Sequence, residues 1–185
     1  FVTPDGQRTM NTFLGATQFL PAAALDEKAV AGASILYLEG YLWDPEEPRA
    51  AMKQAIAAAR GAGREVAFTL SDAFVIARHG DDFRALIDAG EIDVLFANEH
   101  ELAALTGEDD FDAGLAALAP KVPTLVVTRS EKGAVAVSGD KRAYVLAEPI
   151  AHVVDTTGAG DLFAAGFLHG RVGGRSLADC LKAGA

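Results

Sequence analysis

Cysteine, positive charge and long apolar runs are all scarce in this sequence, and each scarcity excludes a class of protein. The single cysteine, Cys180, excludes an internal disulfide and fits a reducing compartment. The net charge of −10 argues against binding along a nucleic-acid backbone. The longest uncharged stretch, residues 9–25, contains Asn11, Gln18 and Pro21 and is too polar to span a bilayer. We therefore expect no nucleic-acid or membrane partner and a cytoplasmic location.

Three familiar site patterns are absent as well. No Gly-Lys-Ser/Thr loop occurs, which excludes an ordinary P-loop enzyme. The Gly-x-Gly at residues 158–160 is not completed by a third glycine at the spacing of a dinucleotide-binding fold. The histidines show no metal-ligand spacing, so we assign them no chemistry; they are His79, His100, His152 and His169.

What is present is the composition of a globular protein and a regular series of apolar runs. Half of the residues are apolar and 23% are charged, and 185 residues suit one domain or slightly more. Four short, continuous apolar runs recur along the chain, at residues 34–38, 66–70, 93–97 and 124–128. Such runs are typical of strands that are buried on both faces of a parallel sheet.

Helical segments are expected between and after these runs, at residues 48–60, 81–89, 98–106 and 111–119. Repeated strand–helix–strand units indicate right-handed crossovers and a doubly wound, mainly parallel α/β sheet. After the fourth strand, residues 134–137 and 143–146 flank Gly139-Asp140, which predicts an antiparallel hairpin at the sheet edge. Near the start, residues 3–6 predict a turn followed by a short strand.

The most informative stretch is Asp-Thr-Thr-Gly-Ala-Gly-Asp at residues 155–161. Each glycine in the first turn of a helix costs about 1 kcal/mol relative to alanine, so its presence needs a reason. Close approach of a ligand supplies one, because glycines bare the N–H groups of a helix start, where the dipole favours an anion. We interpret Gly158, Ala159 and Gly160 as an anion hole, with Asp161 placed to take a proton from the attacking group. An ordinary capped helix with an acidic first turn is the alternative.

A second candidate pair, Asn98 and Glu101, lies at the start of a predicted helix that directly follows a predicted strand. This spacing puts both side chains on one face, beyond the carboxyl end of the sheet, where open α/β folds bind ligands. The alternative is a capping box, with Asn98 as N-cap and Glu101 as its partner.

Three motifs together resemble the ribokinase family, also called the PfkB-type carbohydrate and nucleoside kinases. They are residues 155–161, Asn-Glu-His-Glu at residues 98–101, and the strand and turn at residues 126–133. Their order and spacing agree with the family, so the resemblance covers nearly the whole chain. Residues 8–12 and 70–74 resemble its adenosine-kinase-like branch.

The resemblance implies transfer of the γ-phosphate of ATP to a primary hydroxyl of a sugar or nucleoside, with an adenosine-like acceptor favoured. In this reading the anion hole stabilises the migrating phosphoryl group and Asp161 is the general base. Asn98 and Glu101 are implied to hold Mg²⁺-bound water and the ATP phosphates. Thr128 and Gly133 are implied to line the nucleotide site.

Other implied roles are less specific. Asp155 and Thr157 resemble residues that hold a monovalent cation such as K⁺ beside the anion hole. Glu39 follows the first strand, either as a ligand of the acceptor hydroxyl or as a solvent-facing carboxylate. The family usually has glycine where Ser130 stands, so the turn is expected to approach the nucleotide less closely than usual. Arg129 and Lys132 either assist the phosphates or are solvated.

Members of the resembled family are longer at both ends, and their paired-glycine substrate motif and lid strands are not recognisable here. We interpret residues 1–15 as the remnant of a lid strand that returns to the main domain. Residues 16–185 are expected to form a ribokinase-like α/β domain that is incomplete at both ends. Other functions stay open: a catalytically silent nucleotide- or metabolite-binding module, or a kinase for ribose, fructose or another sugar. Oligomeric state is also open, a homodimer being one alternative.

Overall fold

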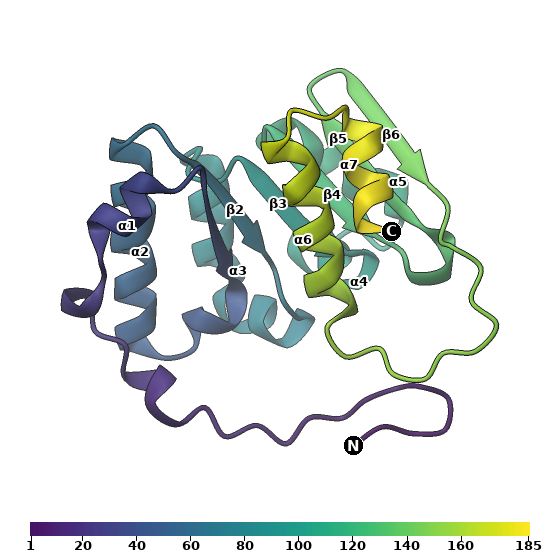
Figure 1. The fold of residues 1–185 in the computed structure, drawn as a ribbon, viewed down its shortest axis with the longest axis horizontal. Coiled ribbons are helices and arrows are strands. Elements are labelled where there is room, and N and C mark those ends of the chain that lie inside the picture. The colour runs from purple at the N-terminus through teal and green to yellow at the C-terminus, as the bar shows by residue number, and fades with distance from the viewer.

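The computed structural model describes residues 1–185 and is built around one six-stranded sheet with the order β1-β2-β3-β4-β5-β6 (Figure 1). The first four strands are parallel; β5 then adds on antiparallel to β4, and β6 antiparallel to β5. Their bounds are β1 Ile35–Glu39, β2 Glu65–Thr69, β3 Val94–Asn98, β4 Thr124–Thr128, β5 Ala134–Ser138 and β6 Lys141–Val145. The predicted α/β class, the mainly parallel sheet and the hairpin after the fourth strand are confirmed.

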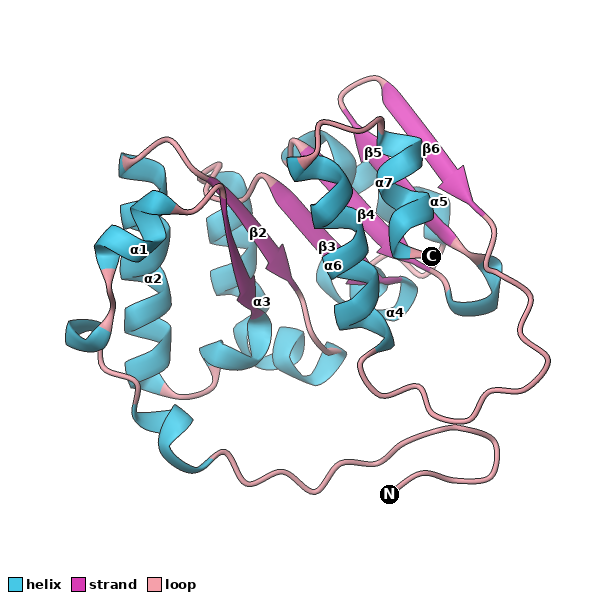
Figure 2. Cartoon of the chain, in the orientation of Figure 1, coloured by secondary structure: helices cyan, strands magenta, loops and turns pink.

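Helices cover both faces of the sheet (Figure 2). The α-helices are α1 Glu27–Gly32, α2 Glu46–Gly61, α3 Ala73–Asp88, α4 Glu99–Thr106, α5 Phe111–Leu118, α6 Ala159–Val172 and α7 Leu177–Gly184. Short 3-10 helices lie at Gly15–Phe19, Ala22–Ala24, Gly40–Trp43, Ala119–Lys121 and Ser130–Lys132. Of these seven α-helices, none is long and apolar enough to cross a membrane.

Two hydrophobic cores follow from the alternation of strand side chains. On one face, Leu38, Phe68 and Leu95 pack with the buried sides of α2 to α5. On the other face, Phe96 packs edge to face against Phe167 of α6, with ring centroids 5.5 Å apart. This second core holds α6 and α7 against the sheet and thereby places the start of α6.

Helix α3 begins at Ala73 rather than at the predicted Asp81. Asp72 caps it, since its carboxylate accepts a hydrogen bond from Phe74 N at 3.0 Å. The first half of the helix was not predicted because Gly80 and its polar neighbours interrupt the apolar pattern. The prediction was wrong there because Val75, Ile76 and Phe83 pack one face of α3 on the core, and this face tolerates the glycine between them.

The first fourteen residues form an arm that crosses the open side of the molecule next to the loop before α6 (Figures 1 and 2). The predicted turn is present, since Gly6 N donates to Thr3 O at 2.9 Å. The strand predicted after it is reduced to one antiparallel bridge, between Val2 and Arg8.

Candidate functional site

The parallel strands end in polar side chains along one edge of the sheet. Glu39 of β1 lies in register with Thr69 of β2, and Asn98 of β3 lies in register with Thr128 of β4. Carboxyl ends of parallel strands are where open α/β sheets bind ligands. The edge therefore brings together three of the predicted site residues.

The start of α6 has the free N–H groups that an anion hole requires. Gly158 is the N-cap residue with φ 75°, and no side chain caps the helix. The N–H groups of Gly158, Gly160 and Asp161 have no partner in the chain, whereas Ala159 N donates to Thr156 O at 3.2 Å. Residues 159–161 are exposed, so an anion can reach them. The anion hole was predicted at Gly158, Ala159 and Gly160. In the structure the N–H group of Ala159 is already bonded, and the N–H group of Asp161 is free in its place.

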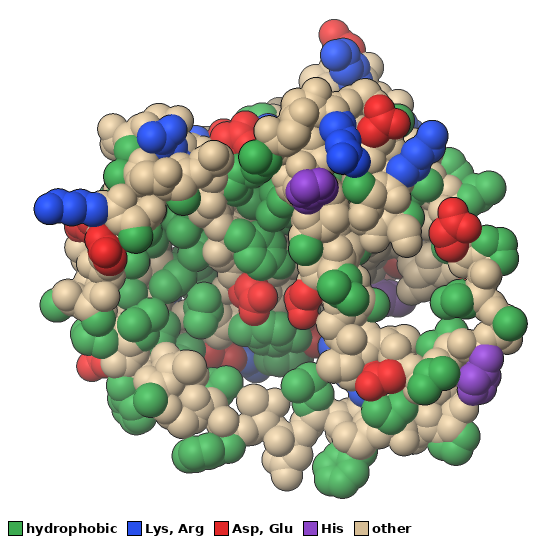
Figure 3. All heavy atoms as spheres, in the orientation of Figure 1, with side chains coloured by type: hydrophobic (Ala, Val, Ile, Leu, Met, Phe, Trp, Pro, Cys, Tyr) green, Lys and Arg blue, Asp and Glu red, His purple; other side chains and the backbone are tan.

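Two carboxylates face this region from different elements. The pKa of Glu39 is raised, first by burial and then by the negative charge of Asp161. The pKa of Tyr37 is also raised, mainly by burial and further by Glu39 and Asp161. Figure 3 shows acidic side chains at the foot of a hollow that apolar side chains line. Glu39 and Asp161 are therefore close enough for their charges to interact, although 122 positions separate their residue numbers, 39 and 161.

Asn98 and Glu101 form the capping box that was the alternative interpretation of this pair. Glu101 N donates to Asn98 Oδ1 at 2.8 Å, and Asn98 N donates to Glu101 Oε2 at 2.9 Å. The side-chain amide of Asn98 also donates to Glu101 Oε1, at 2.7 Å. Burial raises the pKa of Glu101 to about 7, even though the Asn98 N–H favours the ionised form, and Asp72 raises it further. The role of this pair in holding magnesium-bound water stays a prediction.

The donor set fits a magnesium ion that the protein holds through water. Among all described residues, no group of three or more histidine, cysteine, aspartate or glutamate side chains could enclose a metal. Magnesium commonly keeps several waters and binds through one or two carboxylates plus substrate phosphates. A single buried carboxylate such as Glu101 is compatible with that mode of binding, and its contact with magnesium stays a prediction.

The turn after β4 has its own geometric demands. Gly133 has φ 88°, and a Cβ on it would lie 1.9 Å from the carbonyl oxygen of Val145, so only glycine fits beside β6. Ser130 has φ 49°, in the left-handed region that glycine adopts more easily. The glycine at position 133 is thus explained by strand packing, and its contact with a nucleotide stays a prediction.

The two cations of this turn are engaged elsewhere. Arg129 donates to Glu99 at 3.4 Å, and its guanidinium lies 3.7 Å from the centre of the Phe111 ring. Lys132 donates to the same carboxylate at 3.3 Å. Burial opposes ionisation of Glu99, but the bonds from Lys132 and Arg129 outweigh it and lower its pKa. Glu99 therefore partly neutralises both cations.

Asp155 and Thr157 form a closed local pair before the helix. Asp155 Oδ1 accepts from Thr157 Oγ1 at 2.6 Å and from Thr157 N at 2.8 Å. These two bonds lower the pKa of Asp155, and the charge of Arg8 lowers it further. Arg8 is a cation beside an acidic site that the sequence alone did not single out as functional.

An aromatic pair is the second feature that sequence reasoning missed. Tyr41 and Phe74 are 42% and 48% exposed, with ring centroids 6.0 Å apart. The Tyr41 hydroxyl donates to the Ser71 carbonyl at 3.2 Å, and the Arg78 guanidinium lies 4.7 Å from the Phe74 ring centre. Tyr41 follows Glu39 closely, so this pair lies at the same edge as the carboxylates. The available signal was the Leu-Ser-Asp-Ala-Phe motif at residues 70–74, to which no role was given.

Comparison with known proteins finds relatives over the whole length of the chain. The chain is similar to a solved probable sugar kinase from Rhizobium etli CFN 42, at 47% identity and TM-score 0.97, over 100% of this chain and 56% of that one. It is equally similar to adenosine kinase from Sinorhizobium meliloti, at 47% identity and TM-score 0.96, over 100% and 56%. A fructokinase from Klebsiella pneumoniae is 30% identical over 89% of this chain and 55% of its own. The chain thus spans little more than half the length of these relatives. The sequence profile of the "pfkB family carbohydrate kinase" matches residues 1–185, and the chain belongs to that family.

Proposed function

We propose that the whole protein transfers the γ-phosphate of ATP to a primary hydroxyl of a nucleoside, with an adenosine-like acceptor favoured. The observation that carries this proposal is the start of α6, where unpartnered N–H groups and the carboxylate of Asp161 occupy one exposed helical turn. Phosphoryl transfer needs positioning and charge stabilisation more than covalent chemistry, and this turn offers both.

In the proposed reaction the free N–H groups of Gly160 and Asp161 donate to the oxygens of the phosphoryl group as charge shifts among them. The carboxylate of Asp161 accepts the proton of the acceptor hydroxyl as that oxygen attacks the γ-phosphorus, and the bond from phosphorus to the β–γ bridging oxygen breaks, so that ADP leaves. Glu39 accepts a hydrogen bond from another acceptor hydroxyl and orients it. Magnesium, when bound with ATP, neutralises phosphate charge. A monovalent cation near Asp155 and Thr157 belongs to the same proposal.

The aromatic pair favours a nucleoside over a simple sugar. A nucleobase offers an apolar face that stacks on aromatic rings, and such stacking contributes about 1–3 kcal/mol. Tyr41 and Phe74 present exposed rings beside Glu39. A small sugar has less apolar surface to place there. The sugar-kinase alternative is supported by the fructokinase and the probable sugar kinase among the relatives.

An acceptor screen of the full-length protein tests this function. We expect Mg²⁺-ATP-dependent phosphorylation of a purine nucleoside, with kcat/KM at least about tenfold higher than for ribose or fructose. Formation of ADP and of the phosphorylated acceptor is measured by chromatography. Preference for a free sugar would contradict the nucleoside assignment, and no phosphorylation of any hydroxyl would contradict the kinase assignment.

Phe74→Ala is expected to raise KM for the nucleoside about tenfold, because one stacking face is lost, while kcat changes little. Steady-state kinetics with varied nucleoside measure this. Phe19→Ala is the matched control, because Phe19 is also exposed but lies in the 3-10 helix near α2. An equal rise of KM in both variants, or none in Phe74→Ala, would remove the ring from the acceptor site.

A further inference from the structure

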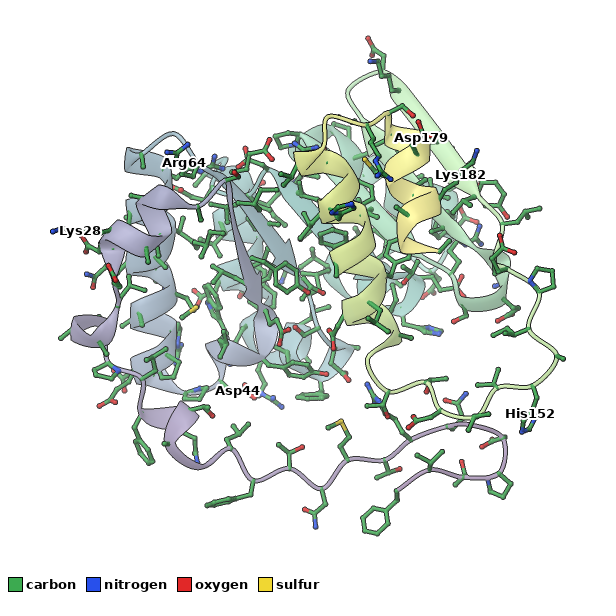
Figure 4. All side chains as sticks on the ribbon, viewed as in Figure 1. Lys28, Asp44, Arg64, His152, Asp179 and Lys182 are labelled. Carbon is green, nitrogen blue, oxygen red and sulfur yellow. The ribbon has the colours of Figure 1, made fainter.

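The loop that leads into the anion hole has almost no support from the sheet. Residues 147–155, between β6 and α6, take part in no backbone–backbone hydrogen bond. His152, labelled in Figure 4, marks the part of this loop that stands out from the body of the molecule. Apart from bonds within the loop and to α6, residues 147–157 make one hydrogen bond, from the Thr156 hydroxyl to the Gly6 carbonyl at 3.3 Å. Its partner belongs to the arm.

Packing at the same place is tight enough to require glycine. Gly6 is buried and has φ 80°. A Cβ on Gly6 would lie 2.6 Å from Val153 Cγ1 and 3.0 Å from the Val153 carbonyl oxygen. Both distances are shorter than ordinary contacts, so the tip of the arm fits against Val153 without a side chain of its own.

The arm tip is itself a firm hairpin. Thr3 N donates to Gln7 O at 2.8 Å, and the Thr3 hydroxyl donates to the same oxygen at 3.0 Å. Phe1 and Thr9 exchange two further bonds, of 2.9 and 2.8 Å. The tip therefore holds its shape independently of the loop that it contacts.

We propose that the turn at residues 3–6 is a brace that positions the anion hole, with Gly6 and Thr156 as positioning residues. Contact with Val153 and Thr156 fixes the backbone that runs through the Asp155–Thr157 pair into Gly158. The free N–H groups of α6 then point at the phosphoryl group before ATP arrives. The inference rests on the proposed kinase function and adds a coupling between the arm and the phosphate site.

Gly6→Ala in the full-length protein tests the brace. The new methyl group pushes Val153 away, and we expect kcat to fall about tenfold while KM for ATP stays within about twofold, because misplacement of catalytic groups costs rate more than ground-state binding. Amide hydrogen exchange of residues 156–161, measured without ligand, is expected to become faster. Steady-state kinetics and exchange mass spectrometry give the two results.

Two variants separate the contact from simple backbone strain. Gly63→Ala is the matched control: Gly63 has φ 66°, but a Cβ there meets nothing within 4 Å. It carries a similar left-handed strain and is expected to leave kcat and the exchange of residues 156–161 unchanged. Val153→Ala in the Gly6→Ala background removes the closest clashing atom and is expected to restore part of both losses.

Unchanged exchange of residues 156–161 in Gly6→Ala would overturn the brace, whatever the activity. Faster exchange with an unchanged kcat would also overturn it as a positioning device, while the kinase function would stand. If the wild-type protein phosphorylates no acceptor, the proposed function fails, and so does the inference that this contact serves catalysis. Equal effects in Gly63→Ala would contradict the proposal as well.

Discussion

Asp161→Asn in the full-length protein is expected to lower kcat by about 10²–10⁴-fold, the usual contribution of a general base. Asparagine keeps the size of the side chain and leaves the backbone N–H groups of α6 in place, but it cannot accept the hydroxyl proton. KM for ATP is therefore expected to change by less than about threefold. Initial rates with saturating acceptor, together with direct measurement of ATP binding, check both halves of the prediction.

A suitable control is Asp179→Asn in the first turn of α7, labelled in Figure 4. It removes a negative charge from a comparable helix position, where Asp179 bonds only to the N-cap Ser176. Full activity is expected for this variant. An Asp161→Asn enzyme with a kcat within about twofold of the wild-type value would exclude Asp161 as the base.

Glu101 is expected to make stability depend on pH in the metal-free protein. Its pKa rises from 4.5 to about 7, first because burial disfavours the charged carboxylate. The folded state thus binds a proton that the unfolded state has released. The stabilising contribution is fully present below pH 4.5, falls as pH rises, and is lost above about pH 7. Its size is about 3 kcal/mol.

Glu101→Gln is expected to remove this pH dependence, because glutamine does not titrate. Denaturant unfolding of both proteins at pH 5 and pH 8 measures it: the loss of unfolding free energy between the two values should be smaller in the variant by about 2–3 kcal/mol. Glu46→Gln, at the exposed first turn of α2, is the control. Its unfolding free energy should change between pH 5 and pH 8 by the same amount as that of the wild type. If the unfolding free energy of the wild type and of Glu101→Gln changes equally between pH 5 and pH 8, Glu101 is already ionised at pH 5.

The sequence predicted those parts of the fold that depend on local pattern. Strands β2, β3 and β4 are mostly buried and appear as continuous apolar runs, as does the half-buried edge strand β1, and the hairpin has turn residues at Gly139-Asp140. The start of α3 was missed because its cap, Asp72, and its interior Gly80 are read correctly only when the packing around them is known. The left-handed backbone of Ser130 could not be predicted from the sequence either, because the turn into β5 sets it.

The site was predicted by motif and spacing, and the contacts between distant segments were not. The helical segments that follow β1 and β2 bring Tyr41 toward Phe74, and the arm brings Gly6 to Val153. Neither contact leaves a periodic signal in the sequence. The capping box of Asn98 and Glu101 was foreseen as one of two interpretations, since a motif cannot distinguish a helix cap from a ligand pair when the same atoms serve both.

We propose that the unpartnered N–H groups at the start of α6 hold the phosphoryl group while it is transferred. A crystal structure of the full-length protein with Mg²⁺-ADP, the acceptor and a metal fluoride that mimics the transferring phosphoryl group tests it most directly. We expect fluoride atoms about 3 Å from the backbone nitrogens of Gly160 and Asp161, with the Asp161 carboxylate within hydrogen-bonding distance of the acceptor hydroxyl. A metal fluoride bound elsewhere on the sheet edge, with these nitrogens still facing solvent, would show that the start of α6 does not bind the transferring group.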